Sequence, residues 1–233
     1  MKNTFTCLCL LWTALIFGQA KIDVQKEFES AARQYEKMLA AHTDTTRFPQ
    51  STNPDGSFRT MPASWWCSGF FGGSLWYLYE FTKDEKWKAA AHRWTMALEK
   101  EKYNTGTHDL GFMLYCPFGN GYRLSGNETH KQSYREVMLT GAKSLATRFD
   151  PAYGVIKSWN KFQQVYDYPV IVDNMMNLEF LFWAAKTSGN KDFYNICLAH
   201  ADSTLKNHFR PDTSSYHVIC YASGGKVLAK KTH

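Results

Sequence analysis

Along this chain, helices that are apolar all round alternate with helices that have one apolar face, and this alternation limits the possible folds. The segments Ser68 to Tyr79 and Asp173 to Ser188 are apolar on nearly every face, as expected of helices buried on all sides. Three other segments carry one apolar face and charges elsewhere: Asp84 to Lys102, Asn127 to Phe149 and Asp192 to His208. The alternation predicts two concentric layers of antiparallel helices, an inner ring wrapped by an outer ring.

The remaining segments fit the same helical chain. Asp23 to Ala41 shows the recurrence of an amphipathic helix, and Thr107 can cap a short helix that runs to Tyr115. Prolines and turn residues make His42 to Ala63 a loop. Strand-like pieces at Gly154 to Trp159 and His217 to Tyr221 are expected to form hairpins at the rim. The predicted fold class is all-α.

Length and composition fit one globular domain. The 233 residues are 44% hydrophobic and 21% charged, which excludes a disordered chain and a coiled coil. Aromatic residues reach 16%, enough for a large core and for flat faces that stack on sugars. The net charge of +6 suits an anionic substrate, but the Lys and Arg residues are too scattered for a nucleic-acid partner.

The first 20 residues are typical of a signal peptide. A positive start at Lys2 precedes an apolar run from Cys7 to Phe17, and Gly18-Gln19-Ala20 supplies the small residues that a signal peptidase reads. The apolar run is too short to span a bilayer. We therefore expect residues 1–20 to be removed and residues 21–233 to be exported, into the periplasm of a bacterium, with no membrane attachment.

Cysteine and histidine spacing points to no metal site. Four cysteines remain after the signal peptide, at positions 67, 116, 197 and 220, and no two of them form a CxxC pair. Disulfides and buried thiols are both compatible with this spacing. No His/Cys cluster has the spacing of zinc ligands, so neither a metal nor another cofactor is predicted.

Two aspartates, Asp109 and Asp173, stand out because each begins a predicted helix within an apolar and aromatic segment. Aspartate at a helix start is most often an N-cap. Two carboxylates in apolar surroundings are also the usual means of acid–base chemistry on a sugar ring.

Four blocks occur in the order seen in glycoside hydrolase family 88, the unsaturated glucuronyl hydrolases, and the chain resembles that family from about Tyr35 to its last residue. The blocks are Trp66 to Gly73 (WCSGFFGG), His108 to Phe112 (HDLGF), Ile156 to Asn160 (IKSWN) and Asp173 to Leu178 (DNMMNL). The resemblance implies an (α/α)6 barrel, in agreement with the two helical layers. Up to Phe209 the chain has only about seven helices, so we expect the N-terminal portion of a barrel truncated at its C-terminal end.

The resemblance also implies the site residues. Asp173 matches the general acid/base and Asp109 its partner carboxylate, while the substrate-contacting positions are His108, Trp66, Trp159 and His217. The implied reaction is acid-catalysed hydration of the C4–C5 double bond that lyases leave in a terminal glucuronyl residue of a glycosaminoglycan-type oligosaccharide. The alternatives are an inactive or merely sugar-binding fragment, and an unsaturated rhamnogalacturonyl hydrolase.

The acid role of Asp173 requires a raised pKa, although a helix start lowers the pKa of a carboxyl. We expect apolar neighbours and repulsion from Asp109 to outweigh this effect at Asp173. Asp109 is expected to be the carboxyl that stays ionised.

Overall fold

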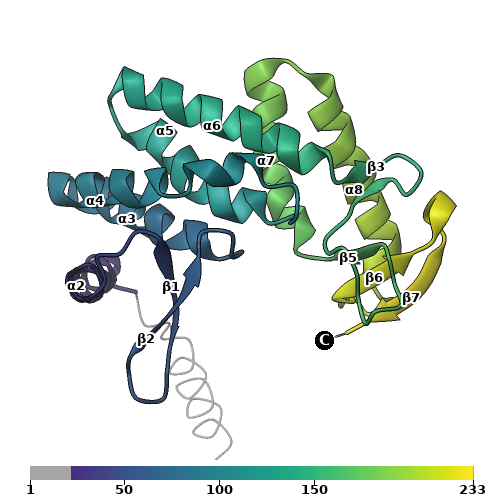
Figure 1. Ribbon diagram of the computed structural model, residues 1–233, viewed down its shortest axis with the longest axis horizontal. Coiled ribbons are helices and arrows are strands. Elements are labelled where there is room, and N and C mark those ends of the chain that lie inside the picture. The colour runs from purple at the N-terminus through teal and green to yellow at the C-terminus, as the bar shows by residue number, and fades with distance from the viewer. Residues whose placement is uncertain (1–21, 233) are drawn as a thin grey trace, which may run out of the picture. The chain divides into compact units, whose positions relative to one another are not determined.

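The computed structural model describes residues 22–232, which are mainly helical (Figure 1). The predicted signal peptide lies outside the described residues, and its prediction stays untested. The chain divides into two units, one that ends at His42 and one that begins at Thr43. Among the described helices, none is long and apolar enough to cross a membrane.

The described part of the first unit is helix α2 (Val24–Ala41), which begins and ends as predicted. The Asp23 carboxylate accepts a hydrogen bond from the backbone N–H of Lys26 at 3.1 Å, so Asp23 is the N-cap. At the other end, the N–H of His42 donates to the carbonyl of Met38. No residue of this helix is buried.

The second unit begins with a β-hairpin where the sequence predicted a loop. Strand β1 (Arg47–Thr52) pairs antiparallel with β2 (Phe58–Pro62). Between them, the N–H of Gly56 donates to the carbonyl of Asn53, and Gly56 takes a φ of +82°, which suits glycine. The prediction of a loop was therefore wrong, because the breakers Asn53 to Gly56 form the turn of a hairpin.

Antiparallel helices then follow in pairs, and the predicted helices are confirmed to within a few residues, except at two places. The segment after Asp84 divides into an α-helix and a 3₁₀-helix, and the helix near Thr107 begins later and is partly a π-helix. The helices are α3 (Ser68–Thr82), α4 (Glu85–Met96), η1 (Glu99–Tyr103), η2 (Gly111–Gly119), α5 (Asn120–Leu124), α6 (Glu128–Ala146), α7 (Asn174–Ser188) and α8 (Lys191–His208).

The inner helix α3 lies unusually close to the π-helix η2. A Cβ atom placed on Gly69 would lie 2.0 Å from the carbonyl oxygen of Phe112, so only glycine fits there. On the outer side, α4 buries Trp94, whose ring packs edge-on against Phe71 of α3 with centroids 4.8 Å apart. These contacts give the two helical layers that the alternation predicted.

Short strands support the segment between α6 and α7. β3 (Phe149–Asp150) pairs with β4 (Val155–Ile156), and β5 (Pro169–Ile171), β6 (Val218–Tyr221) and β7 (Val227–Lys231) form an antiparallel sheet in that order. A separate small core lies here, in which Tyr153 stacks on Tyr168 at 3.8 Å. η3 (Ser223–Gly225) connects β6 to β7. Both predicted strand-like pieces thus contain strands.

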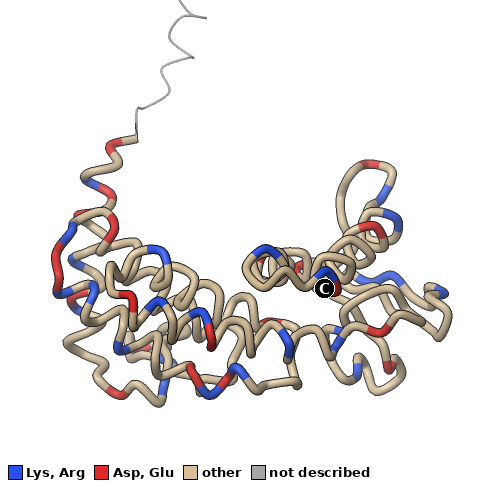
Figure 2. Tube along the Cα trace, turned by 90° about the horizontal axis from the view of Figure 1, so that it is seen from above, with Lys and Arg blue, Asp and Glu red and all other residues tan. Residues whose placement is uncertain are grey.

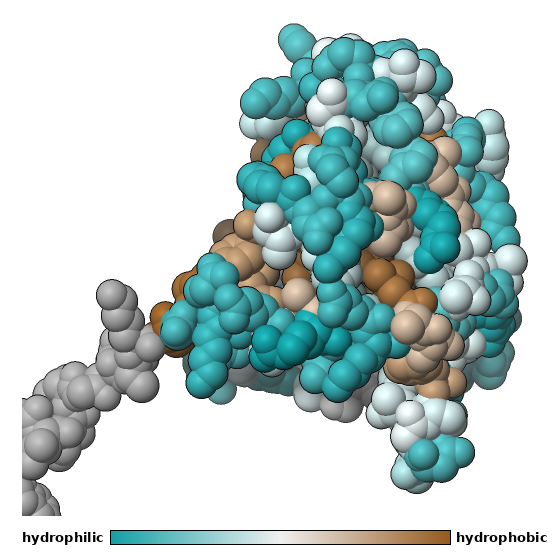
Figure 3. All heavy atoms as spheres, turned by 90° about the vertical axis from the view of Figure 1, so that its left-hand side faces the viewer, coloured by the Kyte–Doolittle hydropathy of each residue, from teal (hydrophilic) through white to brown (hydrophobic). Residues whose placement is uncertain are grey.

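Charges of both signs are interleaved along the trace (Figure 2), as in a solvated surface. Figure 3 shows one face of the molecule, on which hydrophobic side chains reach the surface between hydrophilic ones. Several large apolar side chains of α3, α7 and α8 are also exposed, namely Phe70, Met176, Phe182, Leu198 and Leu205.

The four cysteines of the described chain are free thiols. Cys197 and Cys220 are buried, and Cys67 and Cys116 are half-buried. Burial raises the pKa of the Cys116 thiol to about 11, which makes it a poor nucleophile at neutral pH. The sequence was compatible with disulfides and with free thiols, and in the described residues all four cysteines are free thiols.

Candidate active site

Asp109 stands just before the π-helix η2, but it does not cap this helix. Its Oδ2 accepts a hydrogen bond from the hydroxyl of Thr107 at 2.7 Å, and the hydroxyl oxygen of Thr107 accepts from the N–H of Asp109 at 3.1 Å. The helix predicted from Thr107 to Tyr115 therefore begins at Leu110. Pro117 lies inside it and has no N–H to donate, and π-helices of this kind are frequent at functional sites.

Asp173 directly precedes α7, and its carboxylate makes no hydrogen bond to the helix N-terminus. The capping role that is usual for such an aspartate is thus not used. The neighbouring Val172 donates its N–H to the carbonyl of His217 at 2.9 Å, so the end of β5 is tied to β6. Asp173 is held by this connection on one side and by α7 on the other.

Asn177 joins the two helix starts. Its Oδ1 accepts a hydrogen bond from the N–H of Phe112 at 3.0 Å, and a Cβ on Gly111 would lie 2.6 Å from the same oxygen. The starts of η2 and α7 therefore lie in direct contact, and this contact places His108 and Asp109 beside Asp173.

The three side chains meet at the Nε2 atom of His108. Nε2 lies 3.2 Å from Oδ1 of Asp109 and 3.3 Å from Oδ1 of Asp173. The side chains of His108 and Asp109 are 2% and 11% exposed, whereas that of Asp173 is 41% exposed. We call His108, Asp109 and Asp173 the acid cluster. It has one open member and two buried ones.

The position of one proton follows from the hydrogen bonds of His108. Its Nδ1 lies 3.2 Å from the carbonyl oxygen of Ser158, which can only accept, so Nδ1 carries a hydrogen. A ring with hydrogen on Nδ1 alone would turn the lone pair of Nε2 toward two carboxylate oxygens. A proton on Nε2, a protonated carboxyl or a bound cation would each make this contact favourable.

Burial raises the pKa of Asp109, and the charge of Asp173 raises it further. His108, the hydrogen bond from Thr107 and the more distant Arg148 act in the opposite direction. The expectation that Asp109 is the carboxyl that stays ionised remains a prediction, and the greater burial of Asp109 opposes it.

The acid cluster also has the composition of a metal site. One ligand atom from each of its three residues lies within 4.8 Å of the others, and imidazole with two carboxylates suits a divalent transition metal. The prediction of no metal site used spacing along the sequence, which cannot show a group assembled from residues 65 positions apart. The absence of a metal therefore stays a prediction. A proton within the acid cluster and a bound cation are alternative ways to balance the charges of Asp109 and Asp173.

The other predicted site residues lie on the segments around the acid cluster. Trp66 is 44% exposed, with its ring edge-on to Phe112 at 6.3 Å. Trp159 is half-buried and lies edge-on to His217 at 6.5 Å between centroids. His217 bonds to the residue before Asp173 through its carbonyl. The neighbouring Trp65 is exposed to a similar degree as Trp66.

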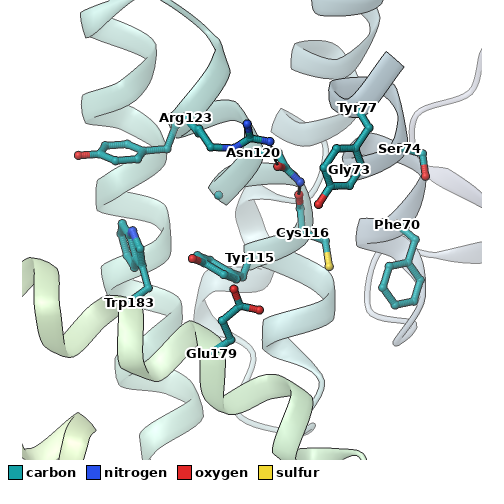
Figure 4. Close-up of a pocket in the computed structure, with 12 residues that line it drawn as sticks. Phe70, Gly73, Ser74, Tyr77, Tyr115, Cys116, Asn120, Arg123, Glu179 and Trp183 are labelled. Atoms are coloured by element: carbon teal, nitrogen blue, oxygen red, sulfur yellow. Dashed lines mark hydrogen bonds between the residues drawn. The ribbon is translucent and has the colours of Figure 1, made fainter. Parts of the chain in front are cut away.

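A pocket of about 600 Å³ lies along the faces of α3, η2, α5 and α7 (Figure 4). Tyr115 and Glu179 project into it below Asn120 and Arg123 (Figure 4). None of the predicted site residues lines this pocket, although Phe70, which does line it, packs edge-on against the ring of Trp66. The acid cluster is thus a separate feature of the structure.

Sequence reasoning missed three residues that support the acid cluster. Arg148 and Ser158 bind the segment that holds His108, and Asn177 joins the helix starts. Asn177 lies in a block that had been singled out, so its polar side chain in an apolar helix was a usable signal. Arg148 gave no signal, because an arginine after an amphipathic helix is ordinarily exposed.

The chain is similar in sequence to named enzymes. It is 40% identical over 214 residues to an unsaturated glucuronyl hydrolase of Formosa agariphila, a match that covers 91% of this chain and 52% of the relative. An unsaturated glucuronyl hydrolase of a Bacillus species is 29% identical, with 80% of this chain and 50% of the relative covered. No family model matches the chain.

Solved structures agree with these sequence matches. An unsaturated glucuronyl hydrolase specific for heparin superposes with a TM-score of 0.83 at 42% identity, over 89% of this chain and 54% of that one. The enzyme from Bacillus sp. GL1 superposes with a TM-score of 0.74 at 26% identity, over 84% and 51%. The described helices thus match enzymes with an (α/α) barrel fold, which confirms the predicted fold class. The chain is similar to unsaturated glucuronyl hydrolases over most of its own length and spans about half the length of the relatives it matches.

Proposed function

We propose that the acid cluster removes an unsaturated glucuronyl residue from oligosaccharides produced by polysaccharide lyases. The observation that carries this proposal is the contact of Nε2 of His108 with carboxylate oxygens of both Asp109 and Asp173, at 3.2 and 3.3 Å. The substrate is an enol ether, and its hydration begins with a proton from an acidic group. The partly exposed carboxyl of Asp173, beside His108 and the buried Asp109, can supply that group.

Asp173 is the member of the acid cluster that can exchange a proton with a substrate. Its side chain is 41% exposed and makes no capping bond. Asp109 is buried, and burial raises its pKa, which suits a partner carboxyl that does not itself meet the substrate. His108 contacts both carboxylates through one nitrogen. We assign the general acid/base role to Asp173 and the partner role to Asp109.

The reaction then proceeds in two proton transfers. The carboxyl of Asp173 gives its proton to C4, and the electrons of the C4–C5 double bond form the new C–H bond. Positive charge develops at C5 and is shared with the ring oxygen. The carboxylate of Asp173 then takes a proton from a water molecule as the water oxygen bonds to C5, which restores the acid. The resulting hemiketal opens, and the hemiacetal left at C1 releases the rest of the oligosaccharide.

Aromatic side chains around the acid cluster are suited to binding a sugar. Trp66 and Trp159 come from different segments, and each presents an accessible ring that can stack on the apolar face of a sugar. The half-buried His217 provides ring nitrogen atoms for hydrogen bonds to hydroxyl or carboxylate groups. We propose Trp66, Trp159 and His217 as the substrate-binding set, whereas His108, which is buried with both ring nitrogens engaged, orients the acid cluster.

The comparisons support a substrate of the glycosaminoglycan type. Both named relatives are unsaturated glucuronyl hydrolases, and the solved structure at 42% identity is specific for heparin. A heparin-derived unsaturated disaccharide is therefore the first substrate to test, with a chondroitin-derived one in parallel. Export to the periplasm is also proposed, from residues 1–20, and a mature N-terminus at Lys21 would support it.

The decisive experiment follows the ultraviolet absorbance of the unsaturated uronate. The wild-type chain should remove this absorbance and should leave a saturated aryl glucuronide intact, because a saturated C4–C5 bond offers nothing to protonate. Asp173→Asn keeps the shape of the side chain without its acidity, and should lower turnover by about 10²- to 10⁴-fold while binding persists. Equal rates on the saturated compound, or full activity of the variant, would refute the mechanism.

A second candidate is sugar binding without turnover, because the accessible rings of Trp66 and Trp159 can stack on a sugar whether or not the acid cluster transfers a proton. Binding of the disaccharide, measured by quenching of tryptophan fluorescence, together with no loss of absorbance, would support this candidate over the enzyme.

A further inference from the structure

Arg148 is a buried arginine whose charge is not used in an ion pair. It lies between α6 and β3 and is only 9% exposed. The ion pairs of the described residues do not include it. A buried guanidinium without a carboxylate partner is costly, so what it does here requires an explanation.

The guanidinium of Arg148 instead holds three backbone carbonyls of two separate segments. Nε donates to the carbonyl of Lys157 at 2.8 Å and Nη2 to that of Ser158 at 2.9 Å. Nη1 donates to the carbonyl of Thr105 at 2.7 Å. The planar fork of arginine can span three acceptors in this way, which the ammonium group of lysine cannot. Arg148 thereby fixes the segment before His108 relative to the segment around Ser158.

The carbonyl of Ser158 connects Arg148 to the acid cluster. The same oxygen accepts from Nη2 of Arg148 and from Nδ1 of His108. This oxygen is what places the hydrogen of His108 on Nδ1 and turns Nε2 toward the two carboxylates. The hydroxyl oxygen of Ser158 accepts from the N–H of Ile171 at 2.9 Å, so the carbonyl is held from the β5 side as well.

We propose that Arg148 is a positioning residue that fixes the Ser158 carbonyl and, through it, the tautomer and orientation of His108. The effect of Arg148 on turnover rests on the proposed function, whereas its effect on the tautomer and orientation of His108 does not. Arg148 also places a fixed positive charge close enough to Asp109 to favour its ionised form. The groups facing Asp109 are then His108, Asp173, Thr107 and Arg148.

The test is the ¹⁵N spectrum of the His108 imidazole in the full chain, which needs no substrate. In the wild type, the signals should be those of a ring with hydrogen on Nδ1. In Arg148→Met and Arg148→Lys, the Nδ1 signal should move away from its wild-type position, because neither side chain can hold the three carbonyls that fix the hydrogen-bond acceptor of Nδ1. Lys157→Met, which removes a neighbouring cation but no carbonyl, should keep the wild-type spectrum.

Three results would overturn the proposal. One is a wild-type spectrum with hydrogen on Nε2 alone, which can be recorded even where the variants fail to fold. The others are a wild-type His108 spectrum in folded Arg148→Met or in folded Arg148→Lys. On an active chain, both variants should lower kcat by about 100-fold with little change in KM, as expected for a group displaced by about 1 Å. A chain without turnover would refute the proposed function and leave the spectra to decide the role of Arg148.

Discussion

Replacement of Gly69 by alanine should separate α3 from η2. The new Cβ would lie 2.0 Å from the carbonyl oxygen of Phe112, and 2.7 Å from that of Met113. Real Cβ atoms do not approach within 3.0 Å, so the two helices must move apart by about 1 Å. Both obstructing atoms belong to the backbone, which cannot rotate away as a side chain can.

The cost of this separation can be estimated. Overpacking costs about 1–3 kcal/mol, and backbone contacts place Gly69→Ala at the upper end of that range. The higher helix propensity of alanine returns about 0.5–1 kcal/mol. The net loss should be about 2 kcal/mol, which corresponds to a urea midpoint lower by about 1 M for a slope near 2 kcal/mol/M.

The matched control is Gly72→Ala on the same helix. Its Cβ would meet the Cβ of Pro117 at 3.2 Å and the hydroxyl of Thr95 at 3.4 Å, so a shift of a few tenths of an ångström suffices. The control should stay within about 1 kcal/mol of the wild type. Urea unfolding followed by tryptophan fluorescence compares the three proteins. Equal midpoints for the two variants would refute the reasoning, because the close approach would then carry no energy.

Three further predictions concern the acid cluster and the surface. Asp109→Asn should lower turnover and stabilise the fold at neutral pH. Because the pKa of Asp109 is raised in the fold, the wild type loses stability as the pH rises through that pKa, and the uncharged asparagine does not. The urea midpoint of the variant should therefore exceed that of the wild type by a margin that grows from pH 4 to pH 8, and a constant margin would contradict this. If the acid cluster holds a proton, EDTA should leave turnover and the melting temperature unchanged. If it holds a metal, EDTA should lower both quantities and added zinc should restore them, which would establish the metal site. The exposed apolar side chains of α7 and α8, including Phe182 and Leu198, should bind a hydrophobic dye, and Leu198→Lys should weaken that binding; undiminished dye fluorescence would locate the patch elsewhere.

The helices could be predicted because their signals are local. The N-caps Asp23 and Asn127 accept hydrogen bonds from residues three positions on, and a periodic apolar face needs no knowledge of the partner. The hairpin at Arg47 to Pro62 was missed because its turn residues are also the residues of loops.

The acid cluster could be predicted in membership but not in electrostatics. His108, Asp109 and Asp173 were named from family blocks. Which carboxyl is buried depends on how Asn177 joins two helix starts, and the sequence holds no local sign of it. Arg148 was invisible for the same reason, since its three acceptors are backbone carbonyls, which every residue has.

The joint between the starts of η2 and α7 has a consequence for the order of folding. The hydrogen bond from the N–H of Phe112 to Asn177 and the contact between His108 and Asp173 each close a loop of 65 residues, whereas the pairs α3–α4 and α7–α8 are joined by short turns. Local contacts form quickly and distant ones slowly, so we expect the helical pairs to form first and the acid cluster last. Contacts that form last are commonly the first to open in the native state. The N–H of Phe112 should therefore exchange its hydrogen with solvent sooner than the buried amides within α3, and the site would be the place where this chain begins to unfold.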